Sequence, residues 1–249
     1  MKGRTLSQFP NLDEEDKLKS QGYELVAGID EVGRGALAGP VVASAVVLPH
    51  PANLPWFELV RDSKELNPSK RESLFDLINK EAVAVGTGIV PSQTIDSMNI
   101  LRATRLAMMQ AVEKLPRQPS FLLIDRITLT QCPIPQRGIT RGDKSCLSIA
   151  CASIIAKVTR DRIMEEFDQV YPGYGFARHK GYGTGRHISC LQKLGPSPIH
   201  RLYFAPVKNI IISRGSGPLA SAHPEPFAIC HSEGVEQPKN LVQGELPDG

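Results

Sequence analysis

Short apolar segments alternate with helical patterns along most of this 249-residue chain. The apolar segments are rich in valine, isoleucine and alanine and end near glycine or proline, as buried strands do. Strands are predicted over residues 25–30, 41–48, 82–90 and 121–125. Helices are predicted over residues 99–115, 147–167 and 184–194, with another beginning at Asn67-Pro68. Strands interleaved with helices indicate an α/β fold, in which helices cover a sheet.

The composition is that of an ordinary globular protein. Hydrophobic residues make up 41% of the chain and charged residues 22%, so a core can form without disulfides or structural metal. No apolar run reaches the about 20 residues that span a bilayer, and the N-terminus lacks the apolar centre of a signal peptide. The five cysteines are scattered and form no C-x-x-C pair. We therefore expect a cytoplasmic protein with no membrane partner.

Composition divides the chain into three parts. Residues 1–22 are polar and are expected to form an N-terminal extension, whereas residues 23–214 hold every predicted strand and helix and form one domain. Residues 215–249 contain five glycines, five prolines and five acids against Lys239, so they are predicted to be a disordered, acidic Pro/Gly-rich tail. The tail carries a net charge of −4 although the whole chain carries +3. The domain is therefore moderately basic, which suits a polyanionic partner.

Four carboxylates stand where α/β proteins usually place their chemistry. Asp30 and Glu31 end the first strand, Asp125 ends a later strand, and Asp143 precedes the long helix. Acids gathered in a half-dry pocket repel one another unless cations lie between them, and oxygen-only ligands favour Mg²⁺ or Mn²⁺. Two such ions suit phosphodiester hydrolysis, because one activates water and the other stabilises the leaving oxygen.

A structural reading of these acids stays open. Taken singly, an aspartate at a strand end is more often a turn or helix cap than a ligand. Neighbouring residues of a strand also point to opposite faces of the sheet. Asp30 and Glu31 are therefore expected to share a site only if the strand distorts after Asp30.

The segment from Gly33 to Ala38 matches G-x-G-x-x-A, the dinucleotide-binding pattern. That pattern must open a helix, but here Gly39-Pro40 and the strand over 41–48 follow. Two acids just before the loop would also repel a pyrophosphate. A dinucleotide site is therefore rejected, which leaves a glycine loop that approaches a ligand closely or a plain tight turn.

The stretch AGIDEVGRGALAGPVV over residues 27–42 resembles the opening motif of ribonuclease HII, the prokaryotic type 2 ribonuclease H. Further matches follow in the family's order, namely DSKEL at 62–66, LID at 123–125, GDKS at 142–145, ASIIAKVTRD at 152–161 and HKGYGT at 179–184. The sister type, ribonuclease HIII, differs in its glycine motif and has a large N-terminal domain. The resemblance covers roughly residues 23 to 209 and implies a ribonuclease H-like fold, a five-stranded mixed sheet flanked by helices.

The resemblance also implies an activity. It implies cleavage of the RNA strand of RNA–DNA hybrids, and of duplex DNA on the 5′ side of an embedded ribonucleotide, with 3′-hydroxyl and 5′-phosphate ends. The implied cofactors are two Mg²⁺ or Mn²⁺ ions, the implied partners are these nucleic acids, and the enzyme is expected to be a monomer. The implied metal-binding and catalytic residues are Asp30, Glu31, Asp125 and Asp143. The implied substrate contacts are Gly33, Arg34 and Gly35 to the 2′-hydroxyl, Ser63 and Lys64 to phosphate, and Tyr182 to the next deoxyribose.

Some residues near these motifs carry separate expectations. Arg126 follows the strand-end aspartate where the family commonly has glycine, which is expected to alter the local turn. Arg160 and Asp161, on the long helix, are expected to be surface or helix-end charges rather than catalysts. His179 either faces nucleic acid or is structural, and His200 and Arg201 either contact phosphate or brace the C-terminal segment.

Three other functions remain as alternatives. A related metal-dependent nuclease of the same fold with another nucleic-acid target would keep the four acids without needing a loop that reads the 2′-hydroxyl. A non-catalytic nucleic-acid-binding protein would bind the same duplexes without cutting them, which the intact set of acids argues against. A dehydrogenase is disfavoured by the strand that follows the glycine loop.

Overall fold

The computed structural model describes residues 9–50 and 54–215, and within them one five-stranded sheet. The strands are β1 (Val26–Val32), β2 (Val41–Val47), β3 (Ala84–Val90), β4 (Phe121–Asp125) and β5 (Gln136–Ile139), arranged in the order β3-β2-β1-β4-β5. β2 is antiparallel to β1 and β3, while β1, β4 and β5 are parallel. The expected mixed five-stranded sheet is confirmed. The predicted tail lies, from residue 216 on, outside the described residues.

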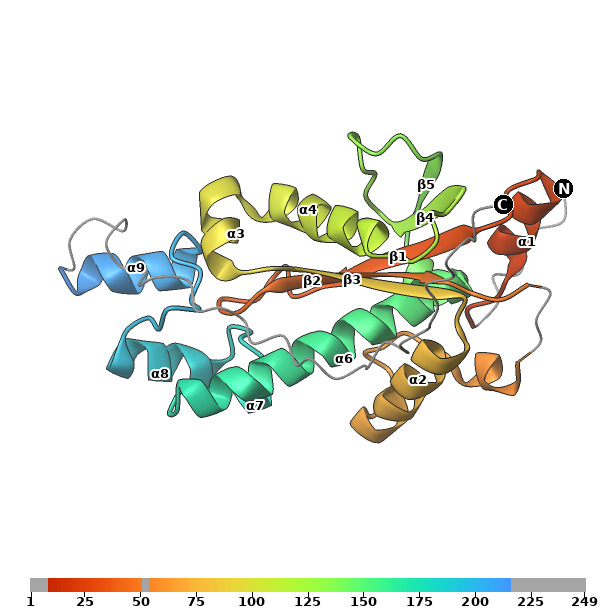
Figure 1. Ribbon diagram of the computed structural model, residues 1–249. Coiled ribbons are helices and arrows are strands. Elements are labelled where there is room, and N and C mark those ends of the chain that lie inside the picture. The colour runs from red at the N-terminus through yellow and green to blue at the C-terminus, as the bar shows by residue number, and fades with distance from the viewer. Residues whose placement is uncertain (1–8, 51–53, 216–249) are drawn as a thin grey trace, which may run out of the picture.

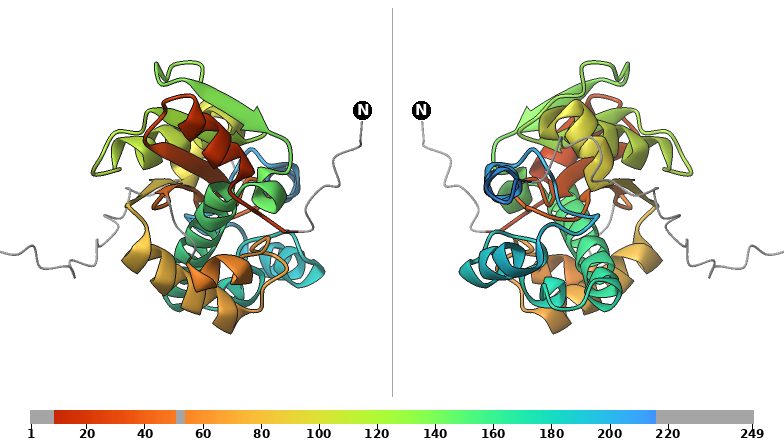
Figure 2. Two further views of the ribbon diagram at one scale, coloured as in Figure 1. Left: turned by 90° about the vertical axis from the view of Figure 1, so that its right-hand side faces the viewer. Right: turned by 90° about the vertical axis from the view of Figure 1, so that its left-hand side faces the viewer.

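Helices cover both faces of the sheet (Figures 1 and 2). Helix α4 (Ile100–Glu113) packs on one face through a buried stripe that includes Ala103, Ala107 and Met108. Helix α6 (Leu147–Val170) packs on the opposite face, with α2 (Pro68–Glu81) outside it. The start of α2 is the predicted one, because the side chain of Asn67 accepts a hydrogen bond from the N–H of Lys70 (2.9 Å).

The first turns of α6 press closely against β1. Small residues of α6, such as Ala150 and Ala152, are fully buried there. On the strand side stands Gly28, where an added Cβ would overlap the backbone of Ser148 and Ile149. This contact fixes the end of β1, and with it Asp30, relative to α6.

Short helices complete the described chain. They are α1 (Asp13–Ser20), the 3-10 turn η1 (Pro55–Leu59), α3 (Ser92–Met98), α5 (Gly142–Ser145), α7 (Phe176–His179), α8 (Gly185–Leu194) and α9 (Ala205–Ser213). Figure 1 shows α7, α8 and α9 at the end of the molecule opposite α1. Within residues 9–50 and 54–215, no helix combines the length and apolarity that crossing a membrane requires.

The part of the expected N-terminal extension that the structure describes packs against the domain. Leu18 of α1 is fully buried, and Asn11 forms a bridge with Cys146. The carboxylate of Glu15 accepts hydrogen bonds from the backbone N–H (2.9 Å) and the hydroxyl (2.6 Å) of Ser148. Because the N-cap residue Cys146 contributes no side-chain cap, Glu15 caps α6 from a distant segment.

We expect Glu15→Ala to lower the free energy of unfolding by about 2–3 kcal/mol, because two buried donors on Ser148 lose their acceptor. Glu15→Gln keeps a carbonyl oxygen at this point and removes a carboxyl whose pKa burial has raised, so its loss should be much smaller. Urea denaturation at neutral pH measures both. Equal losses for the two variants would contradict the capping role.

Candidate active site

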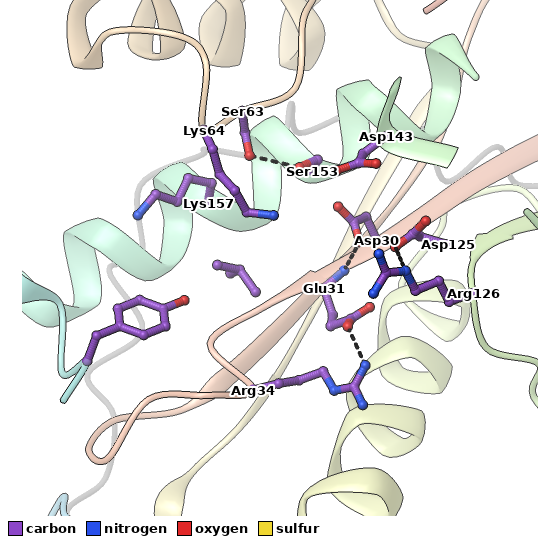
Figure 3. A pocket seen from close by; sticks show the side chains of 12 residues that line it. Asp30, Glu31, Arg34, Ser63, Lys64, Asp125, Arg126, Asp143, Ser153 and Lys157 are labelled. Carbon is purple, nitrogen blue, oxygen red and sulfur yellow. Dashed lines mark hydrogen bonds and ion pairs between the residues drawn. The ribbon is translucent and has the colours of Figure 1, made fainter. Parts of the chain in front are cut away.

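A pocket of about 480 Å³ opens where β1 and β4 end (Figure 3). Its lining residues are Asp30, Glu31, Val32, Arg34, Ser63, Lys64, Asp125, Arg126, Asp143, Ser153, Lys157 and Tyr182. The structure thus brings together all the predicted site residues except Gly33 and Gly35, which lie in the adjoining loop. Four of the lining residues were not predicted site residues, and they are Val32, Arg126, Ser153 and Lys157.

Asp30 and Glu31 share the pocket without the expected distortion of their strand. The pairing of β1 with β2 continues regularly through Val32, so the expectation of a break after Asp30 is wrong. On the other side, the pairing of β1 with β4 stops at Ile29. Beyond that point β1 has no partner in β4, and both Asp30 and Glu31 line the pocket that opens there.

Asp125 and Asp143 are held together by the turn that begins α5. The backbone N–H of Gly142 donates a hydrogen bond to Asp125 Oδ1 (2.8 Å), which ties the end of β4 to the residue just before Asp143. Four carboxylates from three separate chain segments therefore face one pocket, as Figure 3 shows.

The carboxylates disfavour one another's charge. Burial raises the pKa of Asp30 well above its usual range, and the neighbouring charges of Glu31 and Asp125 raise it further. Burial also raises the pKa of Glu31, although the hydrogen bond from Arg34 (3.1 Å) opposes this. The pKa of Asp143 is raised by burial and by nearby acids. Such an arrangement is stable in its ionised form only with added positive charge.

The donor set fits a hard divalent cation. All four side chains offer oxygen, and the buried Oε2 of Glu31 has no hydrogen-bond partner among the described residues. Over residues 9–50 and 54–215, however, no three His, Cys, Asp or Glu side chains are gathered tightly enough to hold an ion by themselves. Mg²⁺ is commonly held by one or two carboxylates together with water and phosphate oxygens, so a pocket lined by acids suits it better than a closed cage.

Basic and hydroxyl groups line the rest of the pocket. Ser63 and Ser153 share a hydrogen bond between their hydroxyls (2.8 Å), with Lys64 and Lys157 nearby (Figure 3). Lys157 is paired with Asp161 (2.7 Å). The pocket therefore offers acids for cations on one side and positive charge for a phosphate on the other. Ser153 and Lys157 were not predicted as site residues, although their spacing carried a signal. They are four residues apart on one helix and so share a face.

Arg126 occupies a backbone conformation that glycine adopts more easily. Its φ is +60°, in the left-handed region. A Cβ in that region costs about 1 kcal/mol, which glycine avoids. The side chain remains largely exposed, with Nε 3.9 Å from Asp125 Oδ2. Asp125 lines the pocket beside Arg126.

The expectation that Arg160 is a surface charge is wrong. Its side chain is fully buried and donates hydrogen bonds to the carbonyl oxygens of Pro40 (2.9 Å), Lys180 (2.9 Å) and Ala38 (3.1 Å). Its guanidinium carbon also lies 5.4 Å from the ring centroid of Tyr182. Arg160 therefore joins the segment after β1 to the segment that carries Tyr182.

Comparison with known proteins gives a consistent picture. The family model described as Ribonuclease HII matches residues 27–207. A protein named Ribonuclease HII from Dehalococcoides mccartyi is 56% identical over 202 residues, which is 81% of this chain and 95% of that protein. The solved structure of ribonuclease H2 from Pyrococcus horikoshii OT3 has a TM-score of 0.67 at 26% identity, covering 78% of this chain and 100% of that one. The structure of Bst-RNase HIII in complex with Mn²⁺ shares the fold, with a TM-score of 0.58 at 19% identity and coverage of 76% and 70%.

Proposed function

Because the chain belongs to the ribonuclease HII family, we propose that it cuts duplex DNA on the 5′ side of embedded ribonucleotides as well as the RNA strand of RNA–DNA hybrids. Membership itself makes the chain a ribonuclease H, a hydrolase that acts on nucleic acid. The proposed products carry 3′-hydroxyl and 5′-phosphate ends. We also expect it to act as a monomer in the cytoplasm, where the free thiols of Cys132, Cys146, Cys151 and Cys190 would stay reduced.

The observation that carries the proposal is the convergence of four acids beside a glycine loop and a tyrosine. Asp30, Glu31, Asp125 and Asp143 line the same pocket as Arg34 and Tyr182. The loop and the tyrosine are also joined directly, since Ala36 forms a bridge with Tyr182. The acids would then act in hydrolysis while the loop and Tyr182 recognise the sugars of adjacent nucleotides.

Two Mg²⁺ or Mn²⁺ ions are the proposed cofactors, held by Asp30, Glu31, Asp125 and Asp143. When bound, they would supply the charge that ionises water at neutral pH and that stabilises the leaving 3′-oxygen. The chain's own groups orient the substrate. Ser63, Lys64 and Tyr182 all line the pocket. We propose that Ser63 and Lys64 contact a phosphate and that Tyr182 packs against the deoxyribose beyond the ribonucleotide.

A matched pair of duplexes tests the function. One is DNA throughout, and the other is identical except for a single ribonucleotide. We expect the wild-type chain to cut only the second, on the 5′ side of the ribonucleotide, and only with Mg²⁺ or Mn²⁺ present. Cutting of both duplexes would favour a nuclease of the same fold with another target, and metal-independent binding without cutting would favour a non-catalytic protein.

Gly35 offers a probe of how closely the substrate approaches the loop. A Cβ at Gly35 would meet no atom within 4 Å, and its φ lies outside the left-handed region. We therefore expect Gly35→Ala to keep wild-type stability within about 1 kcal/mol but to cut the ribonucleotide-containing duplex at least about 10-fold more slowly.

Gly33→Ala is the matched control, because Gly33 has a φ of +93° and its Cβ would overlap Arg160. This variant should lose stability as well as activity. Thermal melting and initial rates measure both variants. A Gly35→Ala variant with full activity would show that the substrate does not touch the loop at this point.

A further inference from the structure

Arg201 lies fully buried behind the glycine loop and makes hydrogen bonds to its backbone alone. Its guanidinium donates to the carbonyl oxygens of Gly33 (2.7 Å), Arg34 (2.9 Å) and Gly39 (2.9 and 3.1 Å). The charge of Asp96 also acts on the guanidinium, but the side-chain hydrogen bonds of Arg201 go to the carbonyl oxygens of the loop. Of the two roles expected for Arg201, the structure therefore supports the brace rather than direct contact with phosphate.

Because peptide units are planar, these contacts also set the direction of the N–H groups on the other side of the loop. The carbonyl of Gly33 and the N–H of Arg34 belong to one trans peptide unit and point in opposite directions. The same holds for the carbonyl of Arg34 and the N–H of Gly35. Because both carbonyls point at the buried guanidinium, both N–H groups point away from it. Neither N–H donates to another group within residues 9–50 and 54–215.

Arg160 provides an internal contrast. It also donates to three carbonyls, those of Ala38, Pro40 and Lys180. The N–H groups of two of these peptide units already have partners within the protein. Gly39 N–H donates to Ile199 O (2.8 Å), and Gly181 N–H donates to His179 Nδ1 (3.2 Å). The peptide units aligned by Arg201, in contrast, leave two donors for a ligand.

The charge of Arg201 strengthens those donors. Burial, with Arg160 nearby, lowers its pKa to about 9, so the guanidinium is still charged at neutral pH. A cation bonded to a carbonyl polarises the whole peptide unit and makes the N–H at its far end a better donor. The arrangement is also rigid, because Arg201 N–H donates to Leu37 O (2.8 Å) and Ala38 forms a bridge with His200.

We propose that Arg201 is a positioning residue for ribonucleotide recognition, which aligns and polarises the N–H groups of Arg34 and Gly35 so that they donate to an oxygen of the substrate's ribose. This inference rests on the proposed function. It predicts that the preference for a ribonucleotide depends on a side chain that never touches the substrate.

The test compares Arg201→Met and Arg201→Lys with wild type. Binding of the single-ribonucleotide duplex and of the all-DNA duplex is measured by fluorescence anisotropy in EDTA, and cleavage of the first duplex is measured with Mg²⁺. We expect Arg201→Met to bind the two duplexes equally within about 2-fold, and kcat/KM for cleavage to fall by about 10-fold or more. Arg201→Lys keeps the positive charge but loses the planar guanidinium that donates to several carbonyls at once. Its preference for the ribonucleotide-containing duplex should therefore lie between those of wild type and Arg201→Met.

Glu15→Ala is the control for lost stability, because Glu15 contacts the start of α6 rather than the loop. It should melt early and yet keep the wild-type ratio of the two binding constants. A purely structural role for Arg201 predicts the same behaviour for Arg201→Met, and an unchanged ratio in that variant would overturn the inference.

A measurement on the wild-type protein covers the case in which the Arg201 variants do not fold. The ¹⁵N–¹H resonances of Arg34 and Gly35 should move when the ribonucleotide-containing duplex binds and should move less with the all-DNA duplex. Equal responses would overturn the inference. The proposed function fails separately, if the wild-type chain does not cut at the ribonucleotide at all.

Discussion

Replacing Asp30 by asparagine is expected to abolish cleavage while leaving the protein at least as stable as the wild type. Asp30 is buried at the end of β1, where Glu31 and Asp125 oppose its charge. An amide of the same shape keeps the packing but cannot supply a negative oxygen to a divalent ion. We expect kcat to fall by about 10³-fold or more, equivalent to about 4 kcal/mol of transition-state stabilisation.

The difference in stability between wild type and Asp30→Asn should depend on pH. The pKa of Asp30 is raised in the folded protein, so its ionised form costs stability. The favourable contribution of its neutral form is present at low pH and is lost as the pH rises through the raised pKa. Without divalent ions, wild type should therefore lose stability relative to Asp30→Asn as the pH rises above about 4.

Divalent ions should reverse this order. We expect Mg²⁺ or Mn²⁺ to bind the folded wild-type protein and to stabilise it by mass action, whereas Asp30→Asn should gain much less. Thermal melting with and without metal measures this, and Asp76→Asn, an exposed change on α2, is the control. A variant that cleaves at the wild-type rate, or that gains as much stability from metal, would rule out Asp30 as a ligand.

The sequence predicts most of the sheet because most of the sheet is apolar. β1 to β4 are hydrophobic runs bounded by glycine, proline or acid, and each was placed within a few residues. β5 reads Gln-Arg-Gly-Ile and is half-exposed, so its strand conformation comes from pairing with β4 rather than from its own pattern. The helices α3 and α9 were likewise not predicted, and α3 is only seven residues long.

The site is predictable in its residues and less so in its geometry. Acids at strand ends identify the pocket, but the point at which β1 loses its partner β4, beside Asp30 and Glu31, depends on strand pairing. Buried arginines are harder still. Arg160 and Arg201 bond to carbonyls more than 100 residues away in the sequence. Arginine is usually exposed, so its type alone gives no warning of such a role.

Acid is expected to destabilise the protein through two buried histidines that support Tyr182. His187 Nδ1 lies 2.9 Å from the carbonyl oxygen of Tyr182, so it carries the proton and donates it. His200 Nδ1 accepts from the N–H of Ser197 (2.9 Å), so its proton is on Nε2. The two Nε2 atoms are 3.0 Å apart, and His200 donates to His187. Each ring holds one proton, and a second proton on either would break this hydrogen-bond chain.

Burial, together with repulsion from a neighbouring histidine, keeps both rings neutral in the fold. Burial lowers the pKa of His187 to about 4, and burial with the nearby His187 lowers that of His200 to about 3. Both values are depressed, so the unfolded chain binds protons first, and stability present above about pH 6.5 is lost as the pH falls. We therefore expect a marked loss of stability between about pH 6.5 and pH 4.

Urea denaturation between pH 7 and pH 4 measures this loss, with His187→Phe and His200→Phe beside wild type. Each variant should be less stable at pH 7, because its partners lose a hydrogen bond, but its stability should fall less steeply with acid. Ser197→Ala is the control, since it removes a hydroxyl 2.8 Å from His200 Nδ1 without removing a titrating ring, and its slope should match wild type. If His187→Phe and His200→Phe keep the wild-type slope, the two rings do not stay neutral in the fold, and the hydrogen-bond chain behind Tyr182 is not as assigned.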